Sequence, residues 1–333
     1  MLSLTLPASD PLGVLQSTLA VVQRARQVRL DFERIETLAT GWADAGWQTP
    51  EWYAALHFND GTGRTLNWML LVDAMNFCFW AESDQPRWAV EYRGQRYDGY
   101  LAEAASLMRA LDEGYPVWDA AYLAALSEHD LRMIFRPAPG APDIPLFAER
   151  LANAREVGRV LLAKYGGQFA RAVEVSGGNA VALVRRIISD FSSFDDVATY
   201  QGSKVRFYKR AQLCVADLHG IFAGQRWGDL SDLDQLTVFA DYKLPQLLRR
   251  EGVLIYAPDL AARVDRMELL PSGSPEEVEI RAATVWAGEL LRRALAARGI
   301  RALATEIDYR LWLLSQARFP DDRPYHRTRT IYY

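Results

Sequence analysis

The stretch SPEEVEIRAATVWAGELLRRALAARG, residues 274–299, carries the clearest structural signal in the chain. Ser274 is a residue type that caps helix N-termini, Pro275 suits the first helical position, and Glu277 completes a capping box. Gly299 is a residue type that ends helices. We therefore predict one long helix that begins at Pro275 and ends just before Gly299.

Similar signals recur along the rest of the chain. Apolar residues spaced three and four apart, together with caps or terminal glycines, predict helices over residues 9–28, 100–114, 147–167, 177–191 and 305–317. Ser9 or Asp10, with Pro11, begins the first of these, and Asn179 caps the fourth. Strand signals are few, but residues 87–100 alternate around Arg93-Gly94 and predict a small hairpin. The expected fold class is mainly α with a minor β element.

A proline-rich segment, FRPAPGAPDIP at residues 135–145, reads as a linker. It predicts an N-terminal helical part, residues 1–145, which includes the hairpin, and a C-terminal helical part, residues 146–333. We expect the two parts to share a core as one compact unit, with the ligand site between them.

Composition and charge disfavour several classes of protein. The chain has 333 residues, of which half are hydrophobic, and a formal net charge of −4. Because affinity for nucleic acids comes largely from neutralising phosphates, this charge argues against a nucleic-acid polymer as partner. No apolar run is long enough to span a bilayer, and the N-terminus lacks the features of a signal peptide, so we expect a cytoplasmic protein.

Common catalytic and metal-binding signatures are missing. Cys78 and Cys214 lie in apolar runs far apart and read as reduced, buried thiols, and the four histidines have no zinc-like spacing. The sequence also lacks a P-loop, a GxSxG, an HExxH and a Rossmann fingerprint. We expect no metal and no cofactor.

What remains is a set of carboxylates in apolar or aromatic surroundings. Asp241 lies in LTVFADYKLPQLL, with Pro245 expected to end or bend the segment, and Asp195-Asp196 follow FSSF. Asp308 precedes Trp312 by one helical turn, and Asp73 interrupts a long apolar run. Desolvation raises the pKa of such a group unless it is paired, which makes it a candidate for acid–base or electrostatic roles. Structural pairing is the alternative for each, and it is weakest for Asp241.

Four cations follow Gly202 in quick succession, at Lys204, Arg206, Lys209 and Arg210. If a helix began near Lys204, these residues would not share one face, which argues against a solvated stripe. Lys204 and Arg206 are expected at a loop or helix start, where backbone N–H groups help to hold a phosphate. The pattern therefore suits one phosphate group better than a chain of them.

Several of these stretches, taken together and in order, resemble the queuosine salvage proteins. They are HFND (57–60), LLVDAMNFCFW (70–80), DFSSFDDVATYQGSKVRFYKRAQLCVADL (190–218), TVFADYKLPQLL (237–248), EVEIRAATVWAGELL (277–291) and IDYRLW (307–312). The resemblance spans roughly residues 50–315. It implies a mainly helical fold similar to that of helix-hairpin-helix DNA glycosylases, and hydrolysis of the N-glycosidic bond of queuosine 5′-phosphate to release queuine.

The resemblance also suggests roles for individual residues. Asp241 is the predicted catalytic carboxylate, because an oxocarbenium-like transition state needs a negative charge near C1′. Asp308 and Tyr200 are predicted to bind ribose or the cyclopentenediol of the base. The predicted phosphate ligands are Lys204, Arg206 and Lys209. The predicted base-binding set is Asp196, with Asp195 as its rival, and Phe194, Phe77, Phe79, Trp80 and His57.

Two other functions remain open at this stage. One is a nucleotide- or RNA-binding module without chemistry, which would tolerate loss of Asp241. The other is a DNA glycosylase, which the net charge disfavours because such a protein needs a basic surface.

Overall fold

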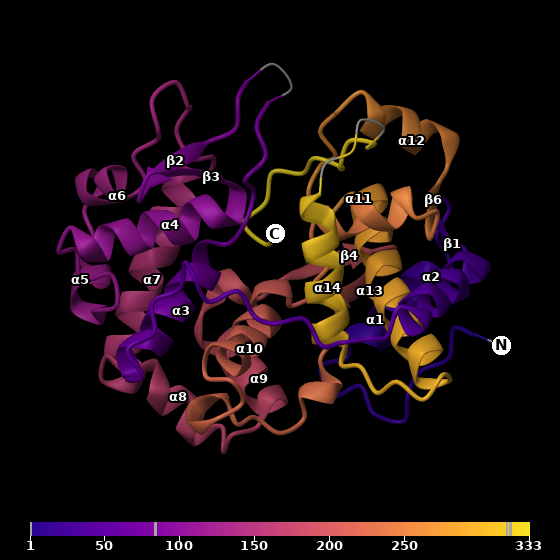
Figure 1. Ribbon diagram of the computed structural model, residues 1–333, viewed down its shortest axis with the longest axis horizontal. Coiled ribbons are helices and arrows are strands. Elements are labelled where there is room, and N and C mark those ends of the chain that lie inside the picture. The colour runs from indigo at the N-terminus through magenta and orange to yellow at the C-terminus, as the bar shows by residue number, and fades with distance from the viewer. Residues whose placement is uncertain (1, 83–84, 318, 320–321) are drawn as a thin grey trace. The chain divides into compact units, whose positions relative to one another are not determined.

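The computed structural model describes residues 2–82, 85–317, 319 and 322–333 (Figure 1). Over these residues the chain is mainly helical, with three antiparallel strand pairs. It separates into two compact units, each built from interleaved segments. The first unit comprises Met1–Glu51, Asp196–Gln212 and Asp232–Arg329, and the second comprises Trp52–Asp195, Leu213–Ser231 and Thr330–Tyr333. The division into parts 1–145 and 146–333 stays a prediction.

The first unit is organised around the helix predicted from residues 274–299. Its elements are α1 (Val14–Val22), β1 (Val28–Leu30), α2 (Phe32–Asp44), β4 (Val197–Tyr200), β5 (Ser203–Arg206), α11 (Lys243–Arg250), β6 (Leu254–Tyr256), α12 (Pro258–Asp265), α13 (Pro275–Ala296) and α14 (Ala304–Gln316). Helix α13 packs against α1, α2, α11, α14 and β1 (Figure 1). Because neighbours cover it on all sides, α13 is buried almost throughout Glu277–Leu291.

The predicted start of α13 is confirmed, with one difference in its cap. The Ser274 hydroxyl accepts a hydrogen bond from the Glu277 N–H at 3.4 Å, and Pro275 is the first helical residue. The Glu277 carboxylate accepts from the N–H of Gly273 at 3.0 Å, one residue before the position that a capping box requires. The helix ends at Ala296, three residues before Gly299, which has a φ of 81°.

A hairpin occupies the stretch that follows Asp196, where a loop or helix start was expected for Lys204 and Arg206, so that expectation is wrong. Strands β4 and β5 pair antiparallel, with Tyr200 opposite Ser203. The turn residues Gln201 and Gly202 have φ values of 47° and 80°, as a tight two-residue hairpin turn requires. Lys204 therefore lies within a strand, and helix α10 (Lys209–Ile221) begins five residues later.

The second unit contains α3 (Gly63–Met75), β2 (Ala89–Tyr92), β3 (Gln95–Asp98), α4 (Gly99–Asp112), α5 (Ala120–Ala124), α6 (Glu128–Ile134), α7 (Phe147–Tyr165), α8 (Phe169–Val175), α9 (Ala180–Asp190) and α10 from Leu213 onward. Helix α3 is buried from Thr65 to Met75 and packs against α4, α7 and α8. Helices α5 and α7 approach closely at Gly158, where a Cβ atom would lie 2.6 Å from the carbonyl oxygen of Ala120.

Most of the other predicted elements are confirmed. Helices α4, α7, α9 and α14 match their predicted ranges, and the Asn179 side chain caps α9 through the N–H of Ala182. Strands β2 and β3 form the predicted hairpin around Arg93-Gly94. The first helix begins only at Val14, because Gly13 has a left-handed φ of 67°. The proline-rich segment joins α6 to α7 within the second unit. None of the described helices has both the length and the apolar character needed to cross a membrane.

Candidate active site

Asp241 ends a segment without regular secondary structure, residues 237–241, that leads into α11 in the first unit. Its Oδ1 accepts hydrogen bonds from the backbone N–H groups of Lys243 and Leu244, both at 2.8 Å. The carboxylate therefore caps α11. Pro245 is the third residue of that helix, in the first turn, where its missing N–H costs no helical hydrogen bond, so it does not end the element. The side chain is partly accessible, and within the described chain its Oδ2 makes no hydrogen bond. One carboxylate oxygen is fixed and the other remains available.

Three side chains from outside hold the segment that precedes Asp241. The Gln212 side-chain oxygen accepts from the N–H of Thr237 at 2.9 Å. Oδ1 of Asp308, on α14, accepts from the N–H of Phe239 at 2.6 Å. Arg281, on α13, donates from Nε to the carbonyl of Ala240 at 3.1 Å. The segment has no regular secondary structure, and these bonds replace those of a helix or sheet.

Asp196 forms a buried ion pair with Arg281. Its two carboxylate oxygens lie 3.0 and 2.6 Å from Nη1 and Nη2 of Arg281, and both side chains are 2% exposed. Asp196 Oδ2 also accepts from the backbone N–H of Lys209 at 3.1 Å. The guanidinium lies over the Phe207 ring at 3.9 Å. The predicted contact of Asp196 with the base stays a prediction, and both of its oxygens already have protein partners.

Two opposing effects set the charge state of Asp241. Burial raises the pKa of its carboxyl group, while the positive charge of Lys209 and the two backbone N–H groups oppose that rise in pKa. Lys209 is itself buried at the start of α10. His326 lies in the same unit, and burial, followed by repulsion from Arg281, lowers its pKa to about 3. The imidazole is therefore neutral at pH 7, which suits a site that already holds two cations.

The hairpin β4–β5 carries three of the predicted ligands. Lys204 is exposed on β5 and forms no ion pair within the described residues. Arg206 lies along α1, where its side chain approaches Gly13 and its N–H donates to Ser17 Oγ at 3.0 Å. Tyr200 is buried, and its hydroxyl donates to Glu279 Oε1 at 2.8 Å. The predicted role of Tyr200 toward ribose or the diol remains untested.

Glu279 anchors the N-terminal segment to α13. Its Oε2 accepts from three successive backbone N–H groups, those of Arg26, Gln27 and Val28, at 3.0, 2.6 and 3.2 Å. With the Tyr200 hydroxyl on Oε1, four donors surround one buried carboxylate. Such an arrangement satisfies a buried negative charge without a cationic partner.

The predicted aromatic ligands of the base belong to the second unit, and several are core residues there. The guanidinium of Arg150, which is buried, lies 4.3 Å from the Phe77 ring centroid and 4.8 Å from that of Phe79. Phe79 also stacks on Trp88, with centroids 6.5 Å apart. Arg150 donates to the backbone carbonyls of Met75 and Phe77, so it fixes the turn that follows α3.

His57 and Phe194 are also enclosed within the second unit. His57 Nε2 lies 2.6 Å from the Tyr100 hydroxyl, and burial lowers its pKa to about 4. Phe194 is fully buried, and its ring meets that of Phe191 edge-on with centroids 6.0 Å apart. Trp80 is also buried, at 3% exposed.

Asp195 differs from these residues, because it is partly exposed. Its carboxylate makes no hydrogen bond or ion pair within the described residues.

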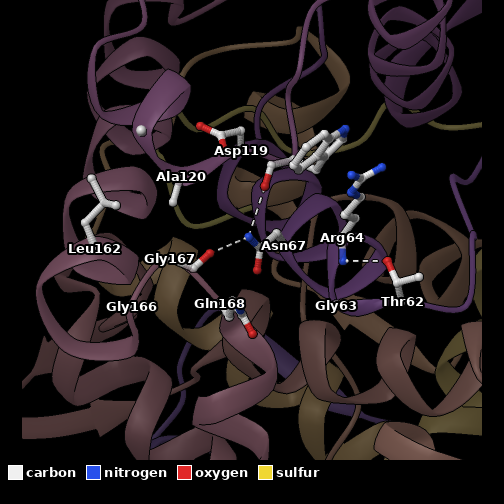
Figure 2. Close-up of a pocket in the computed structure, with 12 residues that line it drawn as sticks. Thr62, Gly63, Arg64, Asn67, Asp119, Ala120, Leu162, Gly166, Gly167 and Gln168 are labelled. Carbon is white, nitrogen blue, oxygen red and sulfur yellow. Dashed lines mark hydrogen bonds between the residues drawn. The ribbon is translucent and has the colours of Figure 1, made fainter.

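A pocket of about 400 Å³ lies in the second unit, and none of the predicted ligands is among the residues that line it (Figure 2). Its walls come from the start of α3, the turn before α5 and the end of α7. The Asn67 amide nitrogen donates to the carbonyls of Trp118 and Gly167 at 3.0 and 2.8 Å, and its oxygen accepts from the N–H of Phe169 at 2.7 Å. Both amide hydrogens are used, so Asn67 joins the walls rather than facing a ligand.

Sequence reasoning missed Arg281, Glu279, Gln212 and His326. Arg281 and Glu279 had a usable signal, because charged residues on a helix that is apolar all round must be buried and therefore partnered. Gln212 and His326 had none. No three His, Cys, Asp or Glu side chains in the described residues come together as metal ligands.

Comparison with known proteins agrees with the early resemblance. The family model described as queuosine salvage protein matches residues 56–333. The chain belongs to this family. The queuosine 5′-phosphate N-glycosylase/hydrolase of Sphaerobacter thermophilus is 49% identical over 324 residues, covering 97% of this chain and 98% of that protein. The relative of the same name from Mus musculus is 37% identical over 97% of this chain and 99% of its own length. That from Schizosaccharomyces pombe is 33% identical, over 85% and 82%.

Proposed function

We propose that this chain is an enzyme that hydrolyses the N-glycosidic bond of queuosine 5′-phosphate and releases queuine and ribose 5-phosphate. The freed base then serves queuine salvage for tRNA modification. Family membership and the shared name of the relatives support the reaction. The observation that carries the mechanism is the carboxylate of Asp241, which has one oxygen fixed, one available, and a pKa raised by burial.

The chemistry requires a group of this kind. Cleavage of an N-glycoside develops positive charge on the ribose, and a nearby carboxylate stabilises that charge and orients or deprotonates the attacking water. A raised pKa makes Asp241 a stronger base, while Lys209 favours its ionised form. The two backbone N–H groups on Oδ1 hold the carboxylate in place, so that Oδ2 faces the reaction without reorganisation.

The base of the substrate limits how its departure is assisted. A 7-deazaguanine has carbon in place of N7, so protonation at that position is not available. Hydrogen bonds to its O6 and N3 carry that role instead. One carboxylate can accept both N1–H and the exocyclic amino group of such a base. The carboxylate of Asp195, which has no hydrogen bond or ion pair among the described residues, suits this contact better than Asp196, whose oxygens are held by Arg281.

The strand β5 carries a cation that is available to the 5′-phosphate. The exposed ammonium of Lys204, which forms no ion pair within the described residues, supports a role toward the 5′-phosphate. Arg206 also has a contact with α1, where its N–H donates to Ser17 Oγ. The positive charge of Lys209 also acts on the Asp241 carboxylate. Both residues therefore have a protein contact in addition to the proposed phosphate contact.

One assay separates this function from a binding module. Purified protein is incubated with queuosine 5′-phosphate, and free queuine and ribose 5-phosphate are measured by mass spectrometry. Wild type releases both, and Asp241→Asn loses turnover by at least about 100-fold while its nucleotide affinity changes little, because the amide keeps the shape but not the charge. Absence of release by folded wild type would refute the proposal. Full activity of Asp241→Asn would remove this carboxylate from the mechanism.

The proposal also covers the fold, the size of the substrate and the cellular location. The fold is similar to that of helix-hairpin-helix DNA glycosylases, which its mainly helical character supports and superposition on such a structure tests. The substrate is a mononucleotide rather than a nucleic-acid polymer, as the net charge of −4 favours, and a gel-shift experiment with tRNA and DNA tests this. The protein acts in the cytoplasm, which imaging of a tagged chain tests.

A further inference from the structure

Arg281 has more structural partners than a simple ion pair requires. It lies in the second turn of α13 and is 2% exposed. Its two terminal nitrogens form a bidentate pair with Asp196 at 3.0 and 2.6 Å. Its Nε donates to the carbonyl of Ala240 at 3.1 Å, and its plane lies over Phe207 at 3.9 Å. Nη1 also lies 3.7 Å from Glu277 Oε1 on α13 itself. Outside that helix, the fork and the third donor point to two different segments of the chain.

Each of these segments leads directly to a residue of the proposed mechanism. Ala240 immediately precedes Asp241 in the chain. Asp196 Oδ2 accepts the backbone N–H of Lys209 at 3.1 Å. A continuous series of hydrogen bonds thus runs from the backbone beside Asp241, through Arg281 and Asp196, to the backbone of Lys209.

We propose that Arg281 is a positioning residue that, through Asp196 and the Ala240 carbonyl, sets the separation between the Asp241 carboxylate and the Lys209 ammonium. The inference rests on the proposed hydrolysis, because it assigns Arg281 a role in that reaction. Arg281 touches neither the ribose nor the base in this role, and it acts only through the residues that it holds.

Stability alone is a poor explanation for this arrangement. A buried ion pair gains little net stability over well-packed apolar residues, because desolvating both charges offsets their attraction. The geometry is also specific to arginine. A planar guanidinium supplies two parallel donors to a carboxylate and a third at Nε, whereas a lysine ammonium cannot reach both segments in this way.

The charges around Asp241 explain why the separation matters. Lys209 on α10 and Lys243 on α11 lower the pKa of Asp241 against the effect of its burial. Asp308 on α14 and Arg281 on α13 hold the two residues that precede it, and His326 beside Arg281 is neutral. If Lys209 moves away from Asp241, its positive charge lowers the Asp241 pKa less. The Asp241 carboxyl then protonates at higher pH, and it is no longer oriented toward the substrate.

The test compares Arg281→Lys with wild type and with Glu289→Gln. Glu289 is a fitting control, because it is also buried on α13 but pairs with Arg292 and Arg293 rather than with either segment. We expect Arg281→Lys to lower kcat by about 100-fold with KM changed less than about 3-fold, as a misplaced catalytic group would. The acidic limb of its kcat profile should move to higher pH. Glu289→Gln should keep kcat within about 2-fold and leave the pH profile unchanged.

The outcomes distinguish the inference from the proposed function. Turnover by wild type together with unchanged kcat and pH profile in Arg281→Lys overturns the positioning role. If folded wild type has no turnover, the proposed hydrolysis fails. The separation is then tested by NMR titration of the Asp241 carboxyl, and an equal pKa in wild type and Arg281→Lys overturns the inference.

A second variant covers the case in which Arg281→Lys does not fold. Asp196→Asn keeps the shape of the side chain but weakens its pairing with Arg281, and we expect it to reproduce the fall in kcat and the shifted acidic limb. A rise in KM alone would overturn the inference, because it would indicate a direct contact between Asp196 and the base.

Discussion

The hydroxyl group of Tyr200 gives the sharpest test of how a predicted ligand is used. The family resemblance predicts that Tyr200 binds ribose or the diol, and in the structure its hydroxyl donates to Glu279 Oε1 at 2.8 Å. Tyr200→Phe removes only this oxygen and keeps the ring, which is 4% exposed, in place. The change therefore separates a structural hydrogen bond from a contact with substrate.

The structure sets the size of the expected effect. A hydrogen bond to a buried charged group contributes about 1.5–3 kcal/mol, and Glu279 is 2% exposed, so solvent cannot replace the lost donor. Its other oxygen keeps the three backbone N–H donors from residues 26–28, so only the bond to Oε1 is lost. We expect Tyr200→Phe to lower the free energy of unfolding by about 2 kcal/mol, with KM changed less than about 2-fold.

The bond should also make stability depend on pH at the alkaline end. Burial first, and then the hydrogen bond and charge of Glu279, raise the pKa of Tyr200 to about 12 from 10.0. The protonated phenol is favoured by folding, so its contribution is complete below pH 10 and is lost as pH rises from 10 to 12. Wild type should lose stability over that interval by more than Tyr200→Phe does.

Denaturant unfolding of wild type, Tyr200→Phe, Glu279→Gln and the double variant measures the coupling of this pair. A coupling free energy of about 1 kcal/mol or more supports the structural bond. Additive effects, together with a tenfold rise in KM for Tyr200→Phe, would refute the reasoning and return Tyr200 to the ligand set.

Two further predictions concern the surface and the helix contacts. Lys204→Ala should weaken the binding of queuosine 5′-phosphate by about tenfold and hardly change the binding of the unphosphorylated nucleoside. Arg301→Ala, at another exposed cation, should change the affinity for neither ligand. Equal losses of affinity for both ligands in Lys204→Ala would exclude a phosphate contact. Gly158→Ala should lower stability by about 1–3 kcal/mol, because its Cβ would meet the backbone of α5, including the Ala120 oxygen at 2.6 Å. Gly41→Ala, inside α2 with open space around it, should instead raise stability by about 1 kcal/mol, and thermal midpoints that do not move in opposite directions would contradict this.

Local chemistry predicted six of the fourteen helices in the described residues, namely α1, α4, α7, α9, α13 and α14. Ser274 and Asn179 cap the helices that they were expected to cap, since a side chain that accepts a nearby N–H acts over three residues of sequence. The same local logic failed after Asp196. Gln201-Gly202 forms a two-residue hairpin turn, but the cations that follow it do not by themselves distinguish a strand from a loop or helix start.

The partners of the buried charges could not be predicted, because they depend on packing over long separations. Asp196 and Arg281 are 85 residues apart, and Glu279 binds N–H groups more than 250 residues away. Burial of a charge on α13 implies that a partner exists. Only the folded arrangement of α1, α13 and the hairpin decides which partner it is.

The segment before Asp241 explains why the candidate catalytic residue is easier to identify than its supports. Residues 237–241 supply no helix or sheet bonds of their own, so a loop here would be mobile unless other elements satisfied its backbone. Gln212, Asp308 and Arg281 do so, and each comes from a different part of the sequence. The position of Asp241 is therefore specified by residues outside its own motif. It follows that a chain with TVFADYK intact but without Arg281 would keep the Asp241 carboxylate and lose its orientation.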